Sequence, residues 1–336
     1  MSAAMFGRDY GSAGGEFFGP TNPESYSERT SSSLMGRWDS EAARTTLRQQ
    51  VLDHLASDDG VLVIDEINFV KDSGAYVGAQ RFVDNDGGQA EHRQTAIVLA
   101  YATASAQGYL DRELFLPRVW TEQESLRIAC GLPSDVTFAT RPQMARTMLE
   151  RALRDGIPHR CIVGGKAFGC DGGMRLWLEE HLEPYVLAIS GRETFRVRGT
   201  AVRAEALTSL WPAEVWRPVR CNGMLPRGEV WAGIRIPSTV GPDWERSLIA
   251  RRKAWDSTET ECFLGFARTG TPIEDLVAAV ARWRRVSVGM RDARQSVGLD
   301  RFTGKSWEGW YRHMTVALMV HAMLGVARRD PMTRPA

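Results

Sequence analysis

The chain is organised around the stretch Val61-Leu62-Val63-Ile64-Asp65-Glu66. Four apolar residues stand in a row, and three of them are β-branched, which predicts a strand buried on both faces. The run ends on two adjacent carboxylates, Asp65 and Glu66. An α/β sheet often presents catalytic groups at this end of a strand, and an acid there can hold a divalent cation. Many buried strands also end in an acid where the chain meets solvent, so these six residues leave both interpretations open.

The rest of the chain alternates between strand-like and helix-like periods, which predicts an α/β fold. Apolar patterns predict strands at 80–84, 94–103, 161–163, 185–189, 248–252 and 262–266, and helices at 38–56, from Pro142 to Gly156, at 173–182, from Pro272 and at 307–326. The sequence Asp84-Asn85-Asp86-Gly87-Gly88 predicts a turn between the second and third strands. The strand–helix–strand unit at 161–189 predicts parallel pairing in the second part of the sheet.

Composition places the chain among ordinary globular proteins. Its 336 residues are 43% hydrophobic and 25% charged, with room for one large domain or a domain with an insertion. The net charge of +1, from 42 Lys and Arg against 41 Asp and Glu, is low for a protein that grips DNA phosphates over a long surface. A local basic patch stays compatible with this balance.

Cysteine spacing and hydropathy point to a cytoplasmic protein without a membrane partner. The five cysteines, Cys130, Cys161, Cys170, Cys221 and Cys262, form no C-x-x-C pair and suggest neither a zinc site nor a disulfide framework. No apolar run is long enough to span a bilayer, and no signal peptide is evident at the N-terminus. We expect reduced thiols and no membrane association.

The order of several motifs resembles the catalytic domain of DDE transposases of bacterial insertion sequences. After Asp65-Glu66 come Phe69 and Lys71, then the apolar run from Gln94 to Tyr101, and then Asp111-Arg112-Glu113-Leu114-Phe115-Leu116-Pro117. Gly309-Trp310-Tyr311-Arg312-His313-Met314-Thr315 follows near the C-terminus. The resemblance runs from about Arg37 to about Val326, and the last two stretches are its most specific pieces.

This resemblance implies an RNase H-like mixed sheet flanked by helices, with a β-rich insertion. The implied domains are a flexible tail at 1–36, the first part of the core at 37–190, the insertion at 191–245 and the remainder of the core with C-terminal helices at 246–330. Phe17-Phe18 and Tyr26 are the tail residues that could dock onto the body or a partner. Relatives usually carry a helical DNA-binding segment before the catalytic domain, and we expect almost none of it here.

The resemblance also implies a site with three carboxylates and two metal ions, of which this sequence keeps one carboxylate. Asp65 matches the first acid. Gly165, in Val163-Gly164-Gly165-Lys166, stands in the place of the second. Ser287 or a neighbour, downstream of Arg282-Trp283, stands in the place of the third. A lone Asp cannot hold two Mg²⁺ ions, so we expect no metal and no cofactor; Mg²⁺ is expected only if transposase activity is retained.

Two aspartates lie near the lost acids in sequence and could replace them, namely Asp171 and Asp292. Lys166 follows one gap and could form a salt bridge with Asp65, because a cation can take over the charge role of a lost metal. The alternative is a new polar pocket in which Asp65, Glu66 and Lys166 act as catalytic groups.

We therefore expect a transposase-derived protein that has lost metal-dependent DNA cleavage and strand transfer and is retained as a binding module. One alternative is an enzyme that uses the former active-site cleft for metal-independent chemistry on a small molecule. The other is a divergent active transposase. The expected partners are DNA, bound weakly and without sequence preference, or a small molecule or protein.

Overall fold

The computed structural model describes residues 38–83, 90–197, 199–220, 228–237 and 240–327. From Asp39 onward the chain forms one unit. The predicted tail with Phe17, Phe18 and Tyr26, the predicted turn at 84–88 and Cys221 lie outside the described residues.

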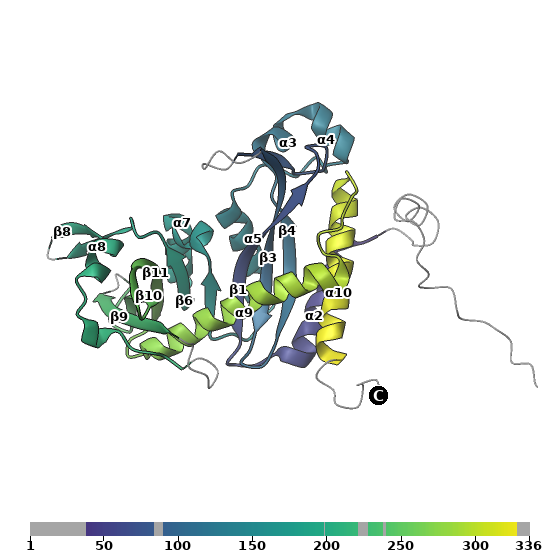
Figure 1. Cartoon of the computed structure of the whole chain (residues 1–336). Helices are drawn as coiled ribbons and strands as arrows, with labels where there is room; N and C mark the ends of the chain where they lie inside the picture. The colour runs from purple at the N-terminus through teal and green to yellow at the C-terminus, as the bar shows by residue number, and fades with distance from the viewer. Residues whose placement is uncertain (1–37, 84–89, 198, 221–227, 238–239, 328–336) are drawn as a thin grey trace, which may run out of the picture. The chain divides into compact units, whose positions relative to one another are not determined.

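The described strands form a nine-stranded sheet and a separate hairpin of two strands (Figure 1). The strands are β1 (Val61–Lys71), β2 (Gln80–Phe82), β3 (Glu91–Ala102), β4 (Gln107–Leu114), β5 (Cys161–Gly164), β6 (Tyr185–Ile189), β7 (Thr194–Val197), β8 (Thr200–Arg203), β9 (Glu229–Pro237), β10 (Trp244–Lys253) and β11 (Asp256–Arg268). The order in the large sheet is β2-β3-β1-β5-β6-β11-β10-β9, with β4 paired to β3, and β7 and β8 form the hairpin.

The strand predicted from Val61 to Glu66 lies in the middle of this sheet. Residues 61–64 are completely buried, as expected for a strand covered on both faces. β1 pairs antiparallel with β3, and β3 pairs antiparallel with β4. On its other side β1 pairs parallel with β5, which pairs parallel with β6. Three antiparallel strands followed by two parallel ones give an RNase H-like fold, so the predicted fold class is confirmed.

The strand predicted at 80–84 is present as β2 (Gln80–Phe82), which pairs antiparallel with the first three residues of β3. The sequence did not predict β4, which is the antiparallel neighbour of β3 on the way to the core. β4 was missed because Asp111, Arg112 and Glu113 occupy its second half. Charged residues are rare in a buried strand, and their partners come from distant parts of the chain.

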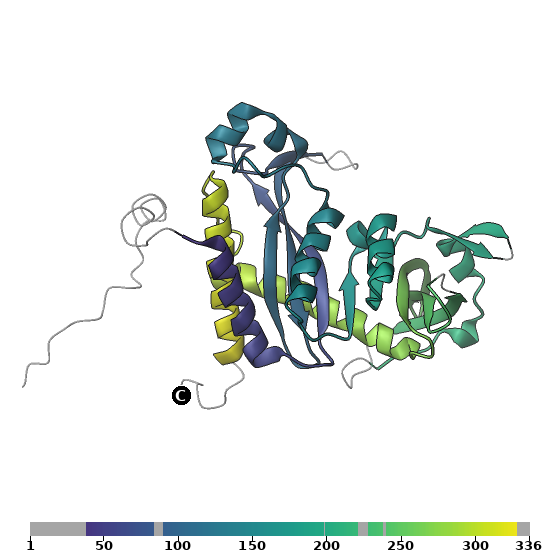
Figure 2. The same ribbon diagram turned by 180° about the vertical axis from the view of Figure 1, so that it is seen from behind.

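Helices cover both faces of the sheet. They are α2 (Ser40–Leu55), α3 (Arg118–Glu122), α4 (Glu124–Cys130), α5 (Arg141–Arg154), α6 (Lys166–Gly169), α7 (Gly172–Glu180), α8 (Ala204–Ser209), the 3₁₀ turn η1 (Ala213–Val215), α9 (Ile273–Val297) and α10 (Trp307–Ala327). In Figure 1, α9 crosses in front of the strands, and Figure 2 shows α5 and α7 on the opposite face. α2 and α10 pack against each other and against β4.

The predicted long helices are confirmed, and their ends follow from local chemistry. Thr140 and Gln143 form a capping box at the start of α5, with a proline in its first turn. Gly156, just beyond that helix, has a φ of +64°, which suits glycine at a helix end. α9 begins directly after Pro272 and ends at Gly298, whose φ is +62°. None of the described helices is long and apolar enough to cross a membrane.

The β-rich segment between β6 and α9 extends the central sheet. β11 pairs antiparallel with β6, β10 with β11, and β9 with β10. The strands at 248–252 and 262–266 that the sequence predicted are parts of β10 and β11, so β-structure continues past residue 245. Along the chain, this extension comes after β6, the last parallel strand of the core, and before α9, which packs back against the core strands.

Candidate functional site

The functional site is built where β1 and β5 stop pairing. Their parallel pairing ends at Ile64 opposite Gly164, so the next residues, Asp65 and Gly165, leave the paired region side by side. This is the strand end at which α/β sheets place their functional groups. α9 crosses this edge and brings Ser287 to Asp65. The structure therefore gathers the three positions that the sequence compared with a carboxylate triad.

The Asp65 carboxylate accepts three hydrogen bonds from neutral donors. Ser287 Oγ donates to Oδ2 over 2.9 Å, and Trp283 Nε1 donates to the same oxygen over 3.1 Å. The backbone N–H of Glu66 donates to Oδ1 over 2.9 Å. Trp283 and Ser287 reach one carboxylate because residues four apart lie on the same face of a helix.

Burial raises the pKa of Asp65 above its ordinary value, and the hydrogen bonds from Ser287, Glu66 and Trp283 oppose that rise. Desolvation penalises the charged carboxylate, whereas hydrogen bonds to the carboxylate favour it. A cation beside the carboxylate would lower this pKa strongly. With neutral donors as its partners, burial remains the dominant effect.

Gly165 contributes no side chain, and the Trp283 ring takes part of the space that one would enter. A Cβ atom built on Gly165 would lie 3.3 Å from Cζ2 of Trp283. That contact is tighter than most Cβ contacts, so a side chain at 165 requires the indole to move by a few tenths of an ångström. Trp283 thus donates to Asp65 and also packs over the neighbouring strand end.

Glu66 faces away from Asp65. Successive side chains of a strand point to opposite faces, and Glu66 accordingly forms an ion pair of 3.1 Å with Arg141, the first residue of α5. The sequence treated the two acids together as catalytic candidates. The structure does not bring Glu66 to the Asp65 carboxylate, and its partner suits a role in fixing α5 to β1.

The salt bridge between Asp65 and Lys166 that the sequence suggested is not formed, although both residues are described. The chain turns into the one-turn helix α6 at Lys166, and the side chain is exposed. Its positive charge instead opposes the rise that burial causes in the pKa of Cys262, on β11, two strands away from β5. Lys166 therefore belongs to the surface beside the site, and the hydroxyl of Ser287 stands where the cation was expected.

Neither Asp171 nor Asp292 replaces a lost acid. Asp171 is the N-cap of α7, where its Oδ1 accepts from the backbone N–H of Met174 over 2.7 Å. Asp292 follows Ser287 by five residues, about 140° further around α9, and lines a cavity there. Among the described residues, no three His, Cys, Asp or Glu side chains come together as a metal site.

The two most specific motifs of the resemblance, at 111–117 and 309–315, are far apart in sequence but lie in contact in the structure. Arg112 Nε donates to Thr315 Oγ1 over 2.8 Å, and Tyr311 Oη donates to Glu113 Oε2 over 2.6 Å. Asp111, completely buried, is surrounded by guanidinium groups, including that of Arg151 at 2.9 Å. These contacts bind α10 and α5 to β4, so the D-R-E-L-F-L-P and G-W-Y-R-H-M-T stretches stabilise the fold.

Trp283 is the site residue whose role the sequence did not reveal. It was visible in the Arg282-Trp283 pair, but only as part of a pattern preceding the third acid. A tryptophan four residues before Ser287 was the available signal, since that spacing places both side chains on one helical face.

Part of the chain matches the model of a known protein family. The family described as DDE superfamily endonuclease matches residues 33–210, which is more than half of the chain. The matched range includes Asp65 and Gly165, whereas Ser287 lies beyond it. No curated protein matches the chain.

Proposed function

The chain belongs to the DDE superfamily endonucleases, and on that basis we propose that it is a transposase-derived protein that has lost metal-dependent DNA cleavage and strand transfer. It is retained as a binding module. The observation that carries this proposal is the environment of Asp65, whose carboxylate is held by the Ser287 hydroxyl and the Trp283 indole. Cleavage by this superfamily depends on metal ions held by three carboxylates.

The residues around Asp65 do not fit two divalent cations. Mg²⁺ requires near-octahedral oxygen ligands, and a pair of ions needs carboxylates from several directions. Asp65 supplies one carboxylate, Gly165 supplies none, and Ser287 supplies a hydroxyl whose proton is directed at Asp65. No metal-dependent step follows from this set of ligands.

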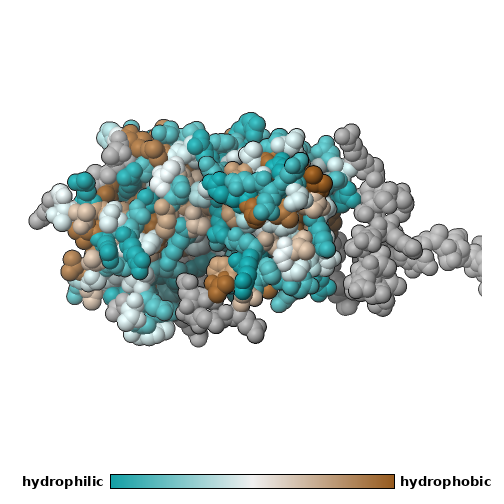
Figure 3. Space-filling view, turned by 90° about the horizontal axis from the view of Figure 1, so that it is seen from above, coloured by the Kyte–Doolittle hydropathy of each residue, from teal (hydrophilic) through white to brown (hydrophobic). Residues whose placement is uncertain are grey.

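The same substitutions favour contact with nucleic acid phosphates without cleavage. A site with three carboxylates repels DNA unless metal ions neutralise it, whereas the present site keeps Asp65 and has the exposed Lys166 next to Gly165 in the chain. Figure 3 shows a mainly hydrophilic face, with hydrophobic residues in small separate groups. A polar partner suits such a face, and with a net charge of +1 the binding is weak, non-specific and sensitive to salt.

Duplex binding and cleavage can be measured on the same samples. Fluorescence anisotropy should show binding that weakens steeply with salt and varies little with sequence, and incubation with Mg²⁺ or Mn²⁺ should leave the duplex intact. Lys166→Glu should reduce binding several-fold. Lys305→Glu, which makes the same charge change at another exposed lysine, is the matched control and should have a smaller effect.

The proposal fails if the protein cleaves DNA with either metal and Asp65→Asn abolishes that cleavage. It also fails as a DNA-binding proposal if the two lysine variants behave alike, or if no duplex is bound at low salt.

One observation favours a second candidate, an enzyme with metal-independent chemistry on a small molecule. The pKa of Asp65 is raised by burial, and a carboxyl group with a raised pKa can serve as a general acid or base. In that case Asp65→Asn should abolish the biological role while the protein stays folded. A binding module should instead keep its role in the same variant.

A further inference from the structure

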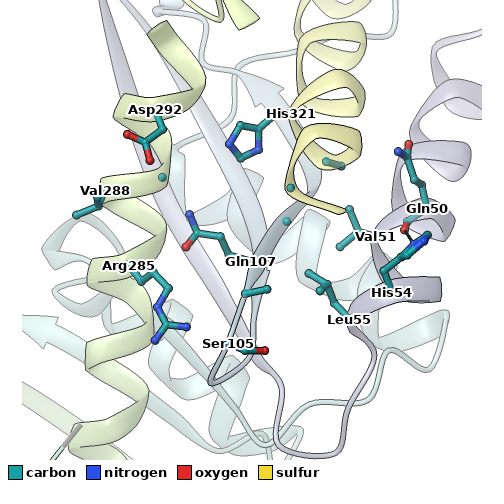
Figure 4. A pocket seen from close by; sticks show the side chains of 15 residues that line it. Gln50, Val51, His54, Leu55, Ser105, Gln107, Arg285, Val288, Asp292 and His321 are labelled. Carbon is teal, nitrogen blue, oxygen red and sulfur yellow. Dashed lines mark hydrogen bonds between the residues drawn. The ribbon is translucent and has the colours of Figure 1, made fainter. Parts of the chain in front are cut away.

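A hollow lies beside the face of α9 that carries Arg285, Val288, Gly289 and Asp292. It is bounded by α9, α2, α10 and the hairpin that joins β3 to β4, and its volume is about 260 Å³ (Figure 4). Small-molecule sites typically begin at roughly 300 Å³, so this cavity suits a ligand of one ring or a short chain. Arg285, Val288, Gly289 and Asp292 line one wall, a spacing that selects a single helical face.

Gln107 projects into this space with an amide that no described residue fixes. Its Oε1 atom is buried and accepts no hydrogen bond from the described residues. Its amide nitrogen packs on Gly289, where an added Cβ would lie only 1.5 Å away. A buried amide oxygen without a donor is unfavourable, and rotation of the amide can present that oxygen to a donor in the cavity.

Asp292 supplies the charge at the rim. No described residue forms an ion pair or a hydrogen bond with its carboxylate, and the side chain is exposed. Arg285, the cation on the same wall, donates through Nη1 to the carbonyls of Thr103 and Ala104 over 3.1 and 2.5 Å. Its charge is therefore directed to the hairpin, which leaves Asp292 as the charged group that faces an occupant.

The remaining lining is largely apolar. Val51 and Leu55 line the space on the α2 side and Val288 on the α9 side (Figure 4). Ala322 of α10 also lines it. The polar side chains of Gln50, His54, Ser105 and His321 line it as well. A mainly apolar space with one carboxylate and with the unsatisfied Gln107 amide oxygen favours a ligand with an apolar body and a cationic head that donates hydrogen bonds.

We propose that this cavity binds a small organic cation, with an ammonium or amidinium group on Asp292 and Gln107 and an apolar body between α2 and α9. This cavity is separate from the site at Asp65, and the proposal does not depend on the function proposed for that site. α9 contributes residues both to this cavity and to the Asp65 site. A ligand bound in the cavity therefore restrains the helix whose Trp283 and Ser287 donate to Asp65.

Benzamidine is a suitable probe, since it places an amidinium on a flat apolar ring. Isothermal titration should show saturable binding to the full chain, and neutral benzamide and anionic benzoate should bind more weakly. Asp292→Asn should weaken benzamidine binding about tenfold or more, because a charge-assisted hydrogen bond is lost. Asp292→Glu should retain part of the affinity. Asp135→Asn, at an exposed acid that does not line the cavity, should leave it unchanged.

Gly289→Ala gives an independent test of the location, because its new methyl group displaces the Gln107 amide into the cavity. The variant should lose benzamidine binding in samples whose thermal unfolding shows a folded protein, and the Asp292 variants carry the test if it does not fold. The proposal is overturned if benzamidine does not bind saturably, if Asp292→Asn binds it as tightly as the wild type, or if benzoate binds equally well.

Discussion

Replacing Asp65 with asparagine distinguishes a carboxylate held by neutral donors from one held by a cation. The amide oxygen can still accept from two donors, so the variant loses at most one of the three hydrogen bonds, about 1 kcal/mol. The change also removes a charge that burial penalises, and the two effects oppose each other. We expect the free energy of unfolding to stay within about 1 kcal/mol of the wild type near neutral pH.

Asp111→Asn is the matched control, because Asp111 is an aspartate with the opposite surroundings. Asp111 is completely buried, and its carboxylate forms ion pairs with Arg151 at 2.9 Å and Arg48 at 3.4 Å. Removing one member of a buried ion pair leaves charges without a partner and typically costs about 3–5 kcal/mol. The two substitutions should therefore differ by several kilocalories per mole, although the chemical change is identical.

The sign of the pH dependence follows from the raised pKa of Asp65. The folded protein holds the Asp65 proton more tightly than the unfolded chain, whose value is near 3.8. The stability from this proton is complete below that value and is lost as pH rises through the folded pKa. The wild type should thus lose stability relative to Asp65→Asn as pH rises from about 4.

Urea unfolding followed by tryptophan fluorescence measures all of these free energies. Two results would contradict these expectations: a loss of stability in Asp65→Asn as large as that in Asp111→Asn, or a wild type that gains stability over Asp65→Asn as pH rises. Either result would mean that a cation holds Asp65.

Three further predictions concern contacts away from Asp65. Tyr311→Phe removes the hydroxyl that donates to Glu113 over 2.6 Å and should cost about 1–3 kcal/mol in urea unfolding; an unchanged midpoint would contradict this. Burial lowers the pKa of His159, but the hydrogen bonds to Glu183 and a backbone carbonyl raise it overall. The stability from this pair is present below the ordinary value of 6.5 and is lost as pH rises through the folded pKa, so His159→Gln should flatten the stability profile above pH 6.5. Lys71→Met removes an ammonium that donates to two carbonyls of the segment before α10 over 2.8 and 3.4 Å; amide exchange should accelerate in that segment, and unchanged protection would count against the assigned role.

Much of the fold was predictable because its signals are local. The apolar runs that became β1 and β6 identify buried strands by composition alone. The starts of α5 and α9 could be placed because proline occupies or precedes the first turn of each helix. The RNase H-like class followed from the resemblance, whose motifs span the described core.

The missed elements depend on partners that are distant in sequence. β4 carries three consecutive charged residues. Only the fold shows that arginines of α2 and α5 pair with Asp111 and that Tyr311, near the start of α10, donates to Glu113. The expected contact between Asp65 and Lys166 failed because the turn into α6 sets the direction of the lysine side chain. The position of Glu66, in contrast, follows from the two-residue period of a strand, a rule that the sequence already allowed.

Titration with Mn²⁺ shows whether the site at Asp65, Gly165 and Ser287 still holds metal ions. Electron paramagnetic resonance counts free and bound Mn²⁺ in the wild type, in Asp65→Asn and in Gly165→Asp/Ser287→Glu, which restores two carboxylates. We expect no stoichiometric tight binding by the wild type, no difference between it and Asp65→Asn, and a gain of binding only in the restored variant. Two ions bound per wild-type chain, and their loss in Asp65→Asn, would contradict this expectation.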